Sequence, residues 1–218
     1  MAELSPAILT NDLSDFRMKY SQLFALSHFF TKLHVDFIDN TFVHNRTLLP
    51  AALSFLKSSP LTLIAHFMCS EPQKYFEDAK NSGFKIILFH FEAFPDKFEI
   101  DGVIASAKSL GLKVGIVADP ETDLQKLSNF LPKVDMVQLM GIHPGFQGRE
   151  FRSDTIDKVR QLRALDKNVI ISVDGGVKIG IARKLAEAGA NILVAGSAIF
   201  RAGDEQTAIE ALKADIQI

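Results

Sequence analysis

The sequence lacks the features that mark several classes of protein. Its 218 residues contain one cysteine, Cys69, so an internal disulfide and a cysteine-rich metal site are both excluded. No apolar run is long enough to cross a bilayer, and the N-terminal residues lack the basic stretch of a signal peptide. Lys and Arg number 24 against 26 Asp and Glu, so the strongly basic character of nucleic-acid-binding proteins is missing. We therefore expect a cytoplasmic protein that binds neither nucleic acid nor membrane.

The composition that remains is typical of a folded globular domain. Hydrophobic residues make up 47% of the chain and charged residues 23%. Tryptophan is absent and tyrosine occurs twice, whereas phenylalanine occurs 18 times, which we attribute to core filling rather than to an aromatic binding cage. No low-complexity linker interrupts the chain. We therefore expect a single domain over residues 1–218.

Short apolar runs alternate with amphipathic segments along the whole chain. We predict strands at residues 4–9, 32–38, 61–68, 84–91, 113–118, 134–140, 168–174 and 191–196. Helices are predicted between Pro72 and Gly83 and at residues 98–110, 121–130, 152–165, 178–189 and 204–214. Eight strand–helix units of about 27 residues each fit an α/β fold of the TIM (β/α)₈ barrel type. An open doubly wound sheet is the alternative, but no GxGxxG motif follows the first strand.

Polar residues gather where the predicted strands end, which is the end of a (β/α)₈ barrel that carries the active site. Five of the six histidines lie there or in the loops that follow, namely His34, His44, His66, His90 and His143. His34 and Asp36 are two residues apart and so share one face of their strand. Together with His66 and Asp174 they could bind a divalent transition metal such as Zn²⁺, Fe²⁺, Co²⁺ or Mn²⁺. The alternative is structural, with the aspartates capping helices and the histidines packed.

Glycine-rich turns follow three predicted strands. Gly175 and Gly176 close the seventh strand, and Gly196 and Ser197 close the eighth. Barrels often bind phosphate in these two loops, because glycines let backbone N–H groups approach an anion. Ordinary tight turns are the alternative. The loop at 143–148 is long enough to cover the barrel mouth.

His90 and Glu92 form a further polar pair on the predicted fourth strand. They either hold a ligand residue in place or form a buried polar pair of structural value.

Seven segments occur in order along nearly the whole chain: PAIL (6–9), HVDFIDNTFVHN (34–45), AHFM (65–68), HFEA (90–93), MGIHPGFQG (140–148), SVDGGV (172–177) and VAGSAIF (194–200). In these segments the chain resembles the ribulose-phosphate 3-epimerases. The resemblance implies a TIM barrel of the ribulose-phosphate-binding type. It also implies a metal-dependent epimerase that interconverts D-ribulose 5-phosphate and D-xylulose 5-phosphate.

The resemblance also implies roles for individual residues. One divalent metal ion, with Zn²⁺ the first choice, would be bound by His34, Asp36, His66 and Asp174. Asp36 and Asp174 would in addition be the catalytic pair that moves a proton on opposite faces of C3. Substrate and phosphate contacts carry over to His66, Met68, Met140, Gly145, Phe146, Gln147, Gly148, Gly175, Gly176, Gly196 and Ser197. The implied partners are a sugar phosphate and further copies of the chain in a homo-oligomer.

The chain departs from the family pattern around this machinery. The departures are Ala7 for Ser, Ile38 for Met, Asn40 for Gly, His44 for Pro, Ala65 for Asp and Gln147 for Gly. The four expected metal ligands are kept, but residues around the substrate site differ. Two alternatives therefore stay open: a 3-epimerase of a ketohexose 6-phosphate, and a non-catalytic sugar-phosphate-binding barrel. A metal-free lyase or decarboxylase is a further alternative. Such enzymes use a lysine near the reacting carbon, and Lys178 is the nearest candidate.

Overall fold

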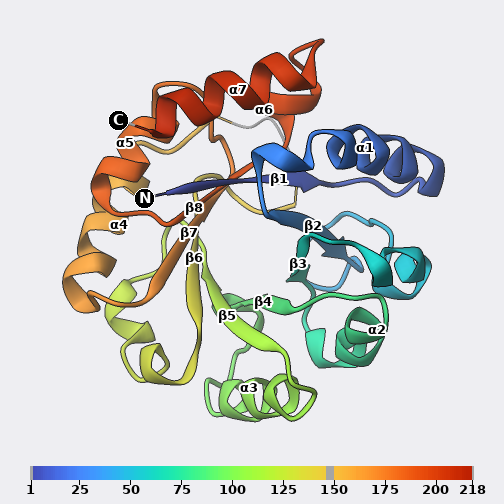
Figure 1. Cartoon of the computed structure of the whole chain (residues 1–218). Coiled ribbons are helices and arrows are strands. Elements are labelled where there is room, and N and C mark those ends of the chain that lie inside the picture. The colour runs from blue at the N-terminus through green and yellow to red at the C-terminus, as the bar shows by residue number, and fades with distance from the viewer. Residues whose placement is uncertain (1, 146–149, 218) are drawn as a thin grey trace.

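Eight parallel strands close into a barrel in the computed structural model, which describes residues 2–145 and 150–217 (Figure 1). Every strand pairs with its neighbours in the sequence, and β1 also pairs with β8 to close the ring. The strands are β1 (Glu3–Ile8), β2 (Lys32–Ile38), β3 (Thr62–Met68), β4 (Ile86–His90), β5 (Lys113–Ala118), β6 (Met136–Met140), β7 (Ile170–Asp174) and β8 (Ile192–Ala195). The predicted TIM barrel is confirmed, and each strand lies close to its expected bounds.

Helices surround the strands in chain order (Figure 1). The α-helices are α1 (Leu13–Ala25), α2 (Phe76–Asn81), α3 (Glu99–Ser109), α4 (Asp154–Leu165), α5 (Ile181–Ala188), α6 (Ser197–Phe200) and α7 (Glu205–Ile216). The 3₁₀ segments are η1 (Ser27–Phe29), η2 (Pro50–Ser58), η3 (Pro72–Tyr75), η4 (Phe91–Ala93), η5 (Leu124–Leu127) and η6 (Leu131–Lys133). Within the described part of the chain, no helix combines the length and apolar character that a membrane span needs.

The helix expected at 121–130 is wrong, because this segment forms only the short 3₁₀ turn η5, and η6 follows directly after it. Its apolar residues Leu124, Leu127 and Phe130 recur every third position and are all buried. A spacing of three places side chains on one face of a 3₁₀ helix, whereas an α-helix needs 3.6 residues per turn. Pro132 removes a backbone N–H donor and prevents the segment from joining into one longer helix.

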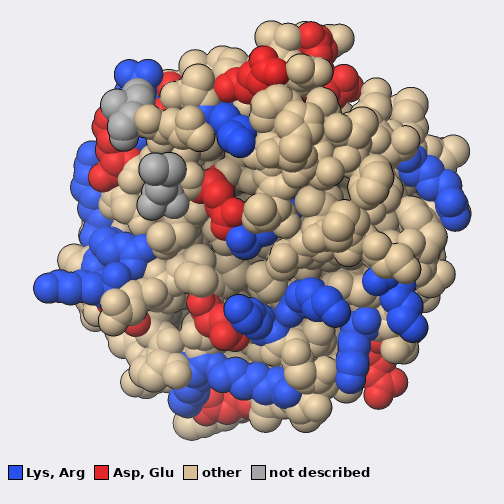
Figure 2. Space-filling model, in the orientation of Figure 1, with Lys and Arg blue, Asp and Glu red and all other residues tan. Residues whose placement is uncertain are grey.

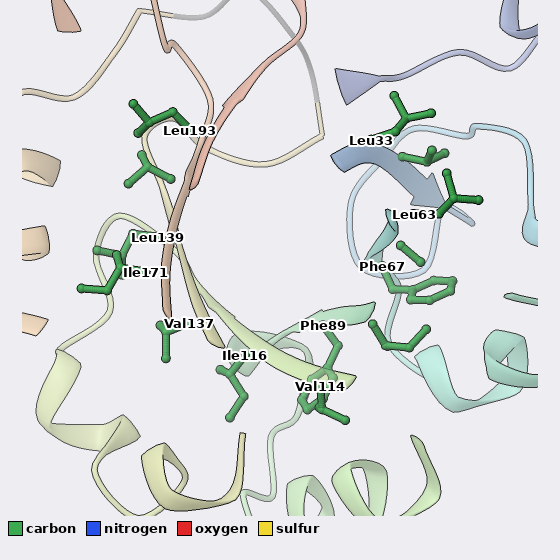
Figure 3. Packing of buried hydrophobic residues seen from close by; sticks show 14 of the residues in the cluster. Leu33, Leu63, Phe67, Phe89, Val114, Ile116, Val137, Leu139, Ile171 and Leu193 are labelled. Atoms are coloured by element: carbon green, nitrogen blue, oxygen red, sulfur yellow. The ribbon is translucent and has the colours of Figure 1, made fainter. Parts of the chain in front are cut away.

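The apolar core has two layers because strand residues alternate in direction. Outward-facing side chains such as Leu33, Leu63, Phe67 and Phe89 pack under the helices (Figure 3). The barrel interior holds a second, smaller cluster, which consists of Ala7, Ile64, Ile86, Leu88, Val117, Met136, Met140, Ile192 and Val194. Apolar side chains therefore fill much of the interior, and polar side chains such as His34, His66 and Gln138 are buried as well.

The single cysteine lies at the end of β3. Cys69 is fully buried, and its thiol donates to the backbone carbonyl of Phe37 at 3.5 Å. Burial raises the pKa of this thiol well above its usual range, and the nearby Asp39 carboxylate raises it further. On the surface, basic and acidic side chains are interspersed over the face seen in Figure 2, in line with the net charge of −2.

Candidate active site at the barrel mouth

Four side chains from three strands converge inside the barrel mouth. β2 supplies His34 and Asp36, β3 supplies His66, and β7 ends on Asp174. Asp36 lies beside His66 in the register of β2 and β3, and the His66 Nδ1 atom is 2.9 Å from Asp36 Oδ1. Asp174 Oδ2 lies 3.4 Å from His66 Nδ1 and 3.6 Å from His34 Nε2. We call these four residues the mouth cluster.

The donor atoms of the mouth cluster suit a divalent cation. One atom from each residue can be chosen so that all four lie within 4.8 Å of one another. His34 is fully buried, yet neither of its ring nitrogens has a hydrogen-bond partner among the described residues. A buried polar atom without a partner is costly, and a metal ion ligated by an imidazole nitrogen removes that cost. Two imidazoles and two carboxylates are a donor set that Zn²⁺ and related transition metals accept.

Electrostatics inside the cluster favour charged aspartate. Burial raises the pKa of Asp36, but the hydrogen bond with His66 and the nearby imidazole of His34 outweigh it and hold the pKa below its usual value. Burial lowers the pKa of His66, but the hydrogen bonds with Asp174 and Asp36 outweigh it and raise the pKa. Asp36 is therefore ionised at neutral pH, which is the form that both binds a cation and accepts a proton.

A pocket of about 480 Å³ opens above the mouth cluster. Asp36 and Asp174 line it from β2 and β7, strands that β1 and β8 separate in the barrel. Of the residues predicted to contact substrate or phosphate, the structure brings seven to its wall: Met68, Met140, Gly145, Gly175, Gly176, Gly196 and Ser197. Ala7 also lines the pocket, so the position where the family carries a serine faces this space.

The turn after β7 needs its glycines. Gly175 and Gly176 have φ angles of 99° and 71°, in the left-handed region that side chains disfavour. A Cβ atom on Gly176 would lie 2.8 Å from the Cβ of Phe151, and one on Gly175 would overlap the Ile142 side chain. The turn is therefore packed too tightly for larger residues, and both of its glycines line the pocket. Helix α6 begins directly after Gly196, so its first backbone N–H groups lack intrahelical acceptors.

Of the other candidates from the sequence, those that the structure describes do not line this pocket. Phe146, Gln147 and Gly148 lie outside the described residues. His44 is exposed, and Ala65 is buried in the outer layer of the core. Lys178 is exposed and lines a separate pocket beside α7, so it does not supply the amine of a lysine-dependent lyase. His143 is exposed near Glu121, at 3.4 Å.

Sequence reasoning missed Gln138, which lies deep in the barrel below Asp174. Its amide Nε2 donates to Asp174 Oδ2 at 3.4 Å, and its Oε1 accepts from the Ser172 hydroxyl at 3.1 Å. The signal was present, because Gln138 is a polar residue at the centre of the apolar run of β6. Between Met136 and Met140, which face the interior, a period of two places it on the same face.

A second polar cluster, formed by His90, Glu92 and Asp119, borders the first. His90 Nδ1 lies 2.9 Å from Asp119 Oδ1, and His90 Nε2 lies 2.9 Å from His66 Nε2. Glu92 accepts from the backbone N–H of Asp119 at 3.0 Å and from the Thr122 hydroxyl. Burial lowers the pKa of His90, but Asp119 and Glu92 outweigh it and raise the pKa to about 9. We call these three residues the β4–β5 cluster.

Solved structures share the fold of this chain. It superposes on 3-hexulose-6-phosphate synthase from Salmonella typhimurium with a TM-score of 0.74, 16% identity and 98% of each chain covered. Orotidine 5′-phosphate decarboxylase from Pyrococcus horikoshii gives a TM-score of 0.70 at 14% identity over 99% of each chain. At these identities the likeness concerns the fold, which is the TIM barrel of ribulose-phosphate-binding type.

Sequence relatives define the family. The model of the ribulose-phosphate 3 epimerase family matches residues 3–200. Ribulose-phosphate 3-epimerase of Escherichia coli is 33% identical over 98% of this chain and 95% of its own length. The chloroplastic ribulose-5-phosphate-3-epimerase of Arabidopsis thaliana is 38% identical over 84% of this chain and 66% of its own length. The chain therefore belongs to the ribulose-phosphate 3-epimerase family, and it is an enzyme of that family.

Proposed function

We propose that this protein inverts C3 of D-ribulose 5-phosphate to form D-xylulose 5-phosphate at the mouth cluster. The observation that carries the proposal is that Asp36 and Asp174 line one pocket from different strands. Inversion beside a carbonyl needs one group to remove a proton and a second group to return a proton to the opposite face. The two pocket-lining carboxylates of the mouth cluster support this assignment, in which Asp36 and Asp174 take one role each.

His34, Asp36, His66 and Asp174 would hold the metal ion of this reaction. A divalent cation there supplies Lewis-acid stabilisation of the negative charge that develops on the substrate oxygens. Asp36, ionised because its pKa is lowered, accepts or returns the C3 proton on one face of the substrate, and Asp174 does so on the other. Met68 and Met140 line the same pocket and exclude water from the reacting carbon.

The phosphate would be bound on the glycine side of the pocket. Gly175, Gly176, Gly196 and Ser197 line it together, and their turns bring backbone N–H groups close to the space inside. The predicted contacts at Phe146, Gln147 and Gly148 would complete this side, and Gly145 is the wall residue that precedes them. The sugar would then extend from the phosphate toward the mouth cluster.

Proton exchange followed by NMR tests the proposal. Protein loaded with Zn²⁺ is mixed with D-ribulose 5-phosphate in D₂O, with a chelator-treated sample as control. We expect deuterium at C3 and formation of D-xylulose 5-phosphate in the loaded sample, and a large decrease in both after chelation. Absence of C3 exchange in protein shown to hold its metal would reject this substrate.

Two further assays separate the alternatives. A competition assay with a ketohexose 6-phosphate tests the longer substrate, for which the smaller side chain of Ala7 leaves more room. A preference for the ketohexose phosphate would reject D-ribulose 5-phosphate as the main substrate. Binding of the sugar phosphate without exchange of any proton would instead indicate a non-catalytic barrel. The cytoplasmic location and the homo-oligomer also stay predictions, and analytical ultracentrifugation measures the second.

A further inference from the structure

A chain of buried hydrogen bonds leads from the mouth cluster to the loop after β5. Asp119 Oδ1 lies 2.9 Å from His90 Nδ1, and His90 Nε2 lies 2.9 Å from His66 Nε2. The other ring nitrogen of His66, Nδ1, faces Asp36 and Asp174. His66 and His90 are both fully buried, so water does not replace either partner. The hydrogen bonds thus run from Asp119 to His90 and from His90 to His66, which belongs to the mouth cluster.

The chemistry of each atom restricts where the protons lie once His66 Nδ1 is a metal ligand. A ligating nitrogen carries no proton, so neutral His66 has its proton on Nε2. That proton is donated to His90 Nε2, which must then be bare. Positive charge at His66 favours this neutral form of His90 and opposes the rise in its pKa that Asp119 and Glu92 cause. His90 consequently carries its own proton on Nδ1, where the Asp119 carboxylate accepts it. Every contact in the chain is then a hydrogen bond, and no other arrangement of neutral rings satisfies all of them.

We propose that His90 and Asp119 are positioning residues that fix the tautomer and ring orientation of His66, so that Nδ1 is presented to the metal ion. The inference rests on the proposed function, in which His66 is a metal ligand. Partners of this kind behind a ligating histidine typically contribute 10–100-fold to metal affinity. Asp119 is itself held in place, because its backbone N–H donates to Glu92 at 3.0 Å.

Histidine NMR tests the tautomers in the unmodified protein. Protein with ¹⁵N-labelled histidine is loaded with Zn²⁺, and long-range ¹H–¹⁵N correlations assign the protonated nitrogen of each ring. We expect His66 to be protonated on Nε2 and His90 on Nδ1. A proton on Nδ1 of His66 in the Zn²⁺-loaded protein would overturn the proposal. This measurement needs no substitution, so it stands even if a variant fails to fold.

Substitutions at Asp119 measure the size of the effect. Asp119→Ala removes the acceptor, and we expect Zn²⁺ affinity, measured by competition with a chelating dye, to decrease 10–100-fold. Asp119→Asn keeps a carbonyl oxygen that can accept from His90, so it should restore most of the affinity. Glu121→Gln is the matched control, because Glu121 lies in the same loop, is exposed and pairs with Arg152. Its affinity should equal that of the unmodified protein.

The outcomes distinguish this inference from the proposed function. If the unmodified protein binds Zn²⁺ and Asp119→Ala binds it as tightly as Glu121→Gln, the positioning role is wrong and the metal site stands. If the unmodified protein binds no Zn²⁺ at the mouth cluster, both the metal site and the positioning role are wrong. A selective loss in Asp119→Ala, with recovery in Asp119→Asn, supports the proposal, because a merely structural loss would not follow the hydrogen-bond acceptor.

Discussion

The mouth cluster and the β4–β5 cluster both combine histidine with carboxylates, yet they differ in how the histidine ring nitrogens are satisfied. In the mouth cluster, neither ring nitrogen of His34 has a hydrogen-bond partner among the described residues, and both aspartates line a pocket. In the β4–β5 cluster, both ring nitrogens of His90 have partners at 2.9 Å. An unpaired buried histidine beside pocket-lining carboxylates therefore favours a binding site at the mouth cluster. The fully hydrogen-bonded ring of His90 fits the supporting role that we propose for the β4–β5 cluster.

The largest expected effect comes from removing one proton-transfer group of the mouth cluster. Asp174→Asn should lower turnover of D-ribulose 5-phosphate by about 10²–10⁴-fold, because one face of C3 loses its acid/base group. Deuterium incorporation at C3 measures the loss, and circular dichroism checks that the fold is kept. Asp119→Asn is the matched change in the β4–β5 cluster and should retain most activity. Comparable turnover in Asp174→Asn and the unmodified protein would contradict the two-base scheme.

The next largest effect is the loss of Zn²⁺-dependent stabilisation of the folded protein when His34 is removed. Zn²⁺ at about 100 times its Kd should stabilise the unmodified protein by about 2.7 kcal/mol, because it binds the folded state alone. For a chain of this size the midpoint of thermal unfolding should rise by about 5–10 °C. In His34→Ala the rise should be largely lost at the same Zn²⁺ concentration. His143→Ala removes an exposed histidine and should keep the full rise. An unchanged rise in His34→Ala would remove His34 from the ligand set.

A smaller effect is expected from Glu92, the member of the β4–β5 cluster that hydrogen-bonds to Asp119 and Thr122. Glu92→Gln keeps one oxygen that can accept from Asp119 N–H and from Thr122, and loses the charge beside His90. We expect a loss of about 1 kcal/mol in the free energy of unfolding, measured by urea denaturation, from the weakened hydrogen bonds. Zn²⁺ affinity should change far less than in Asp119→Ala. A larger loss of affinity in Glu92→Gln would make Glu92, rather than Asp119, the main support of His90.

The smallest effect concerns the pocket wall at Ala7. Ala7→Ser should restore a hydroxyl facing the sugar and improve kcat/KM for D-ribulose 5-phosphate by about 2–10-fold, the worth of one hydrogen bond. Stability should stay nearly unchanged. Ala65→Ser is the control, because Ala65 is fully buried in the outer layer, where a new hydroxyl adds no contact with the pocket. An equal gain in both variants, or none in Ala7→Ser, would show that the missing hydroxyl is not what limits turnover.

Much of this arrangement could be predicted from residues close together in the chain. The period of two in a strand places His34 beside Asp36, and the regular alternation of strands and helices predicts the barrel that brings Asp174 to them. The left-handed turn at Asn40, with a φ of 71°, explains why the family has glycine there and why asparagine is tolerated.

The rest depends on contacts that no local pattern encodes. Asp119 meets His90 across 29 positions of the sequence, after an apolar strand that carries no sign of a polar partner. The short 3₁₀ turns η5 and η6 were also not predicted. Over so short a segment, apolar residues at every third position resemble one face of an α-helix.

The burial of Cys69 has a practical consequence for measuring how the barrel opens. The thiol is the only one in the sequence, and burial together with Asp39 keeps it protonated, so it is a poor nucleophile in the folded protein. A thiol reagent therefore labels the chain when the structure around Cys69, directly after β3, opens locally. The labelling rate therefore measures how often the protein opens locally beside the active site, and no added probe is needed.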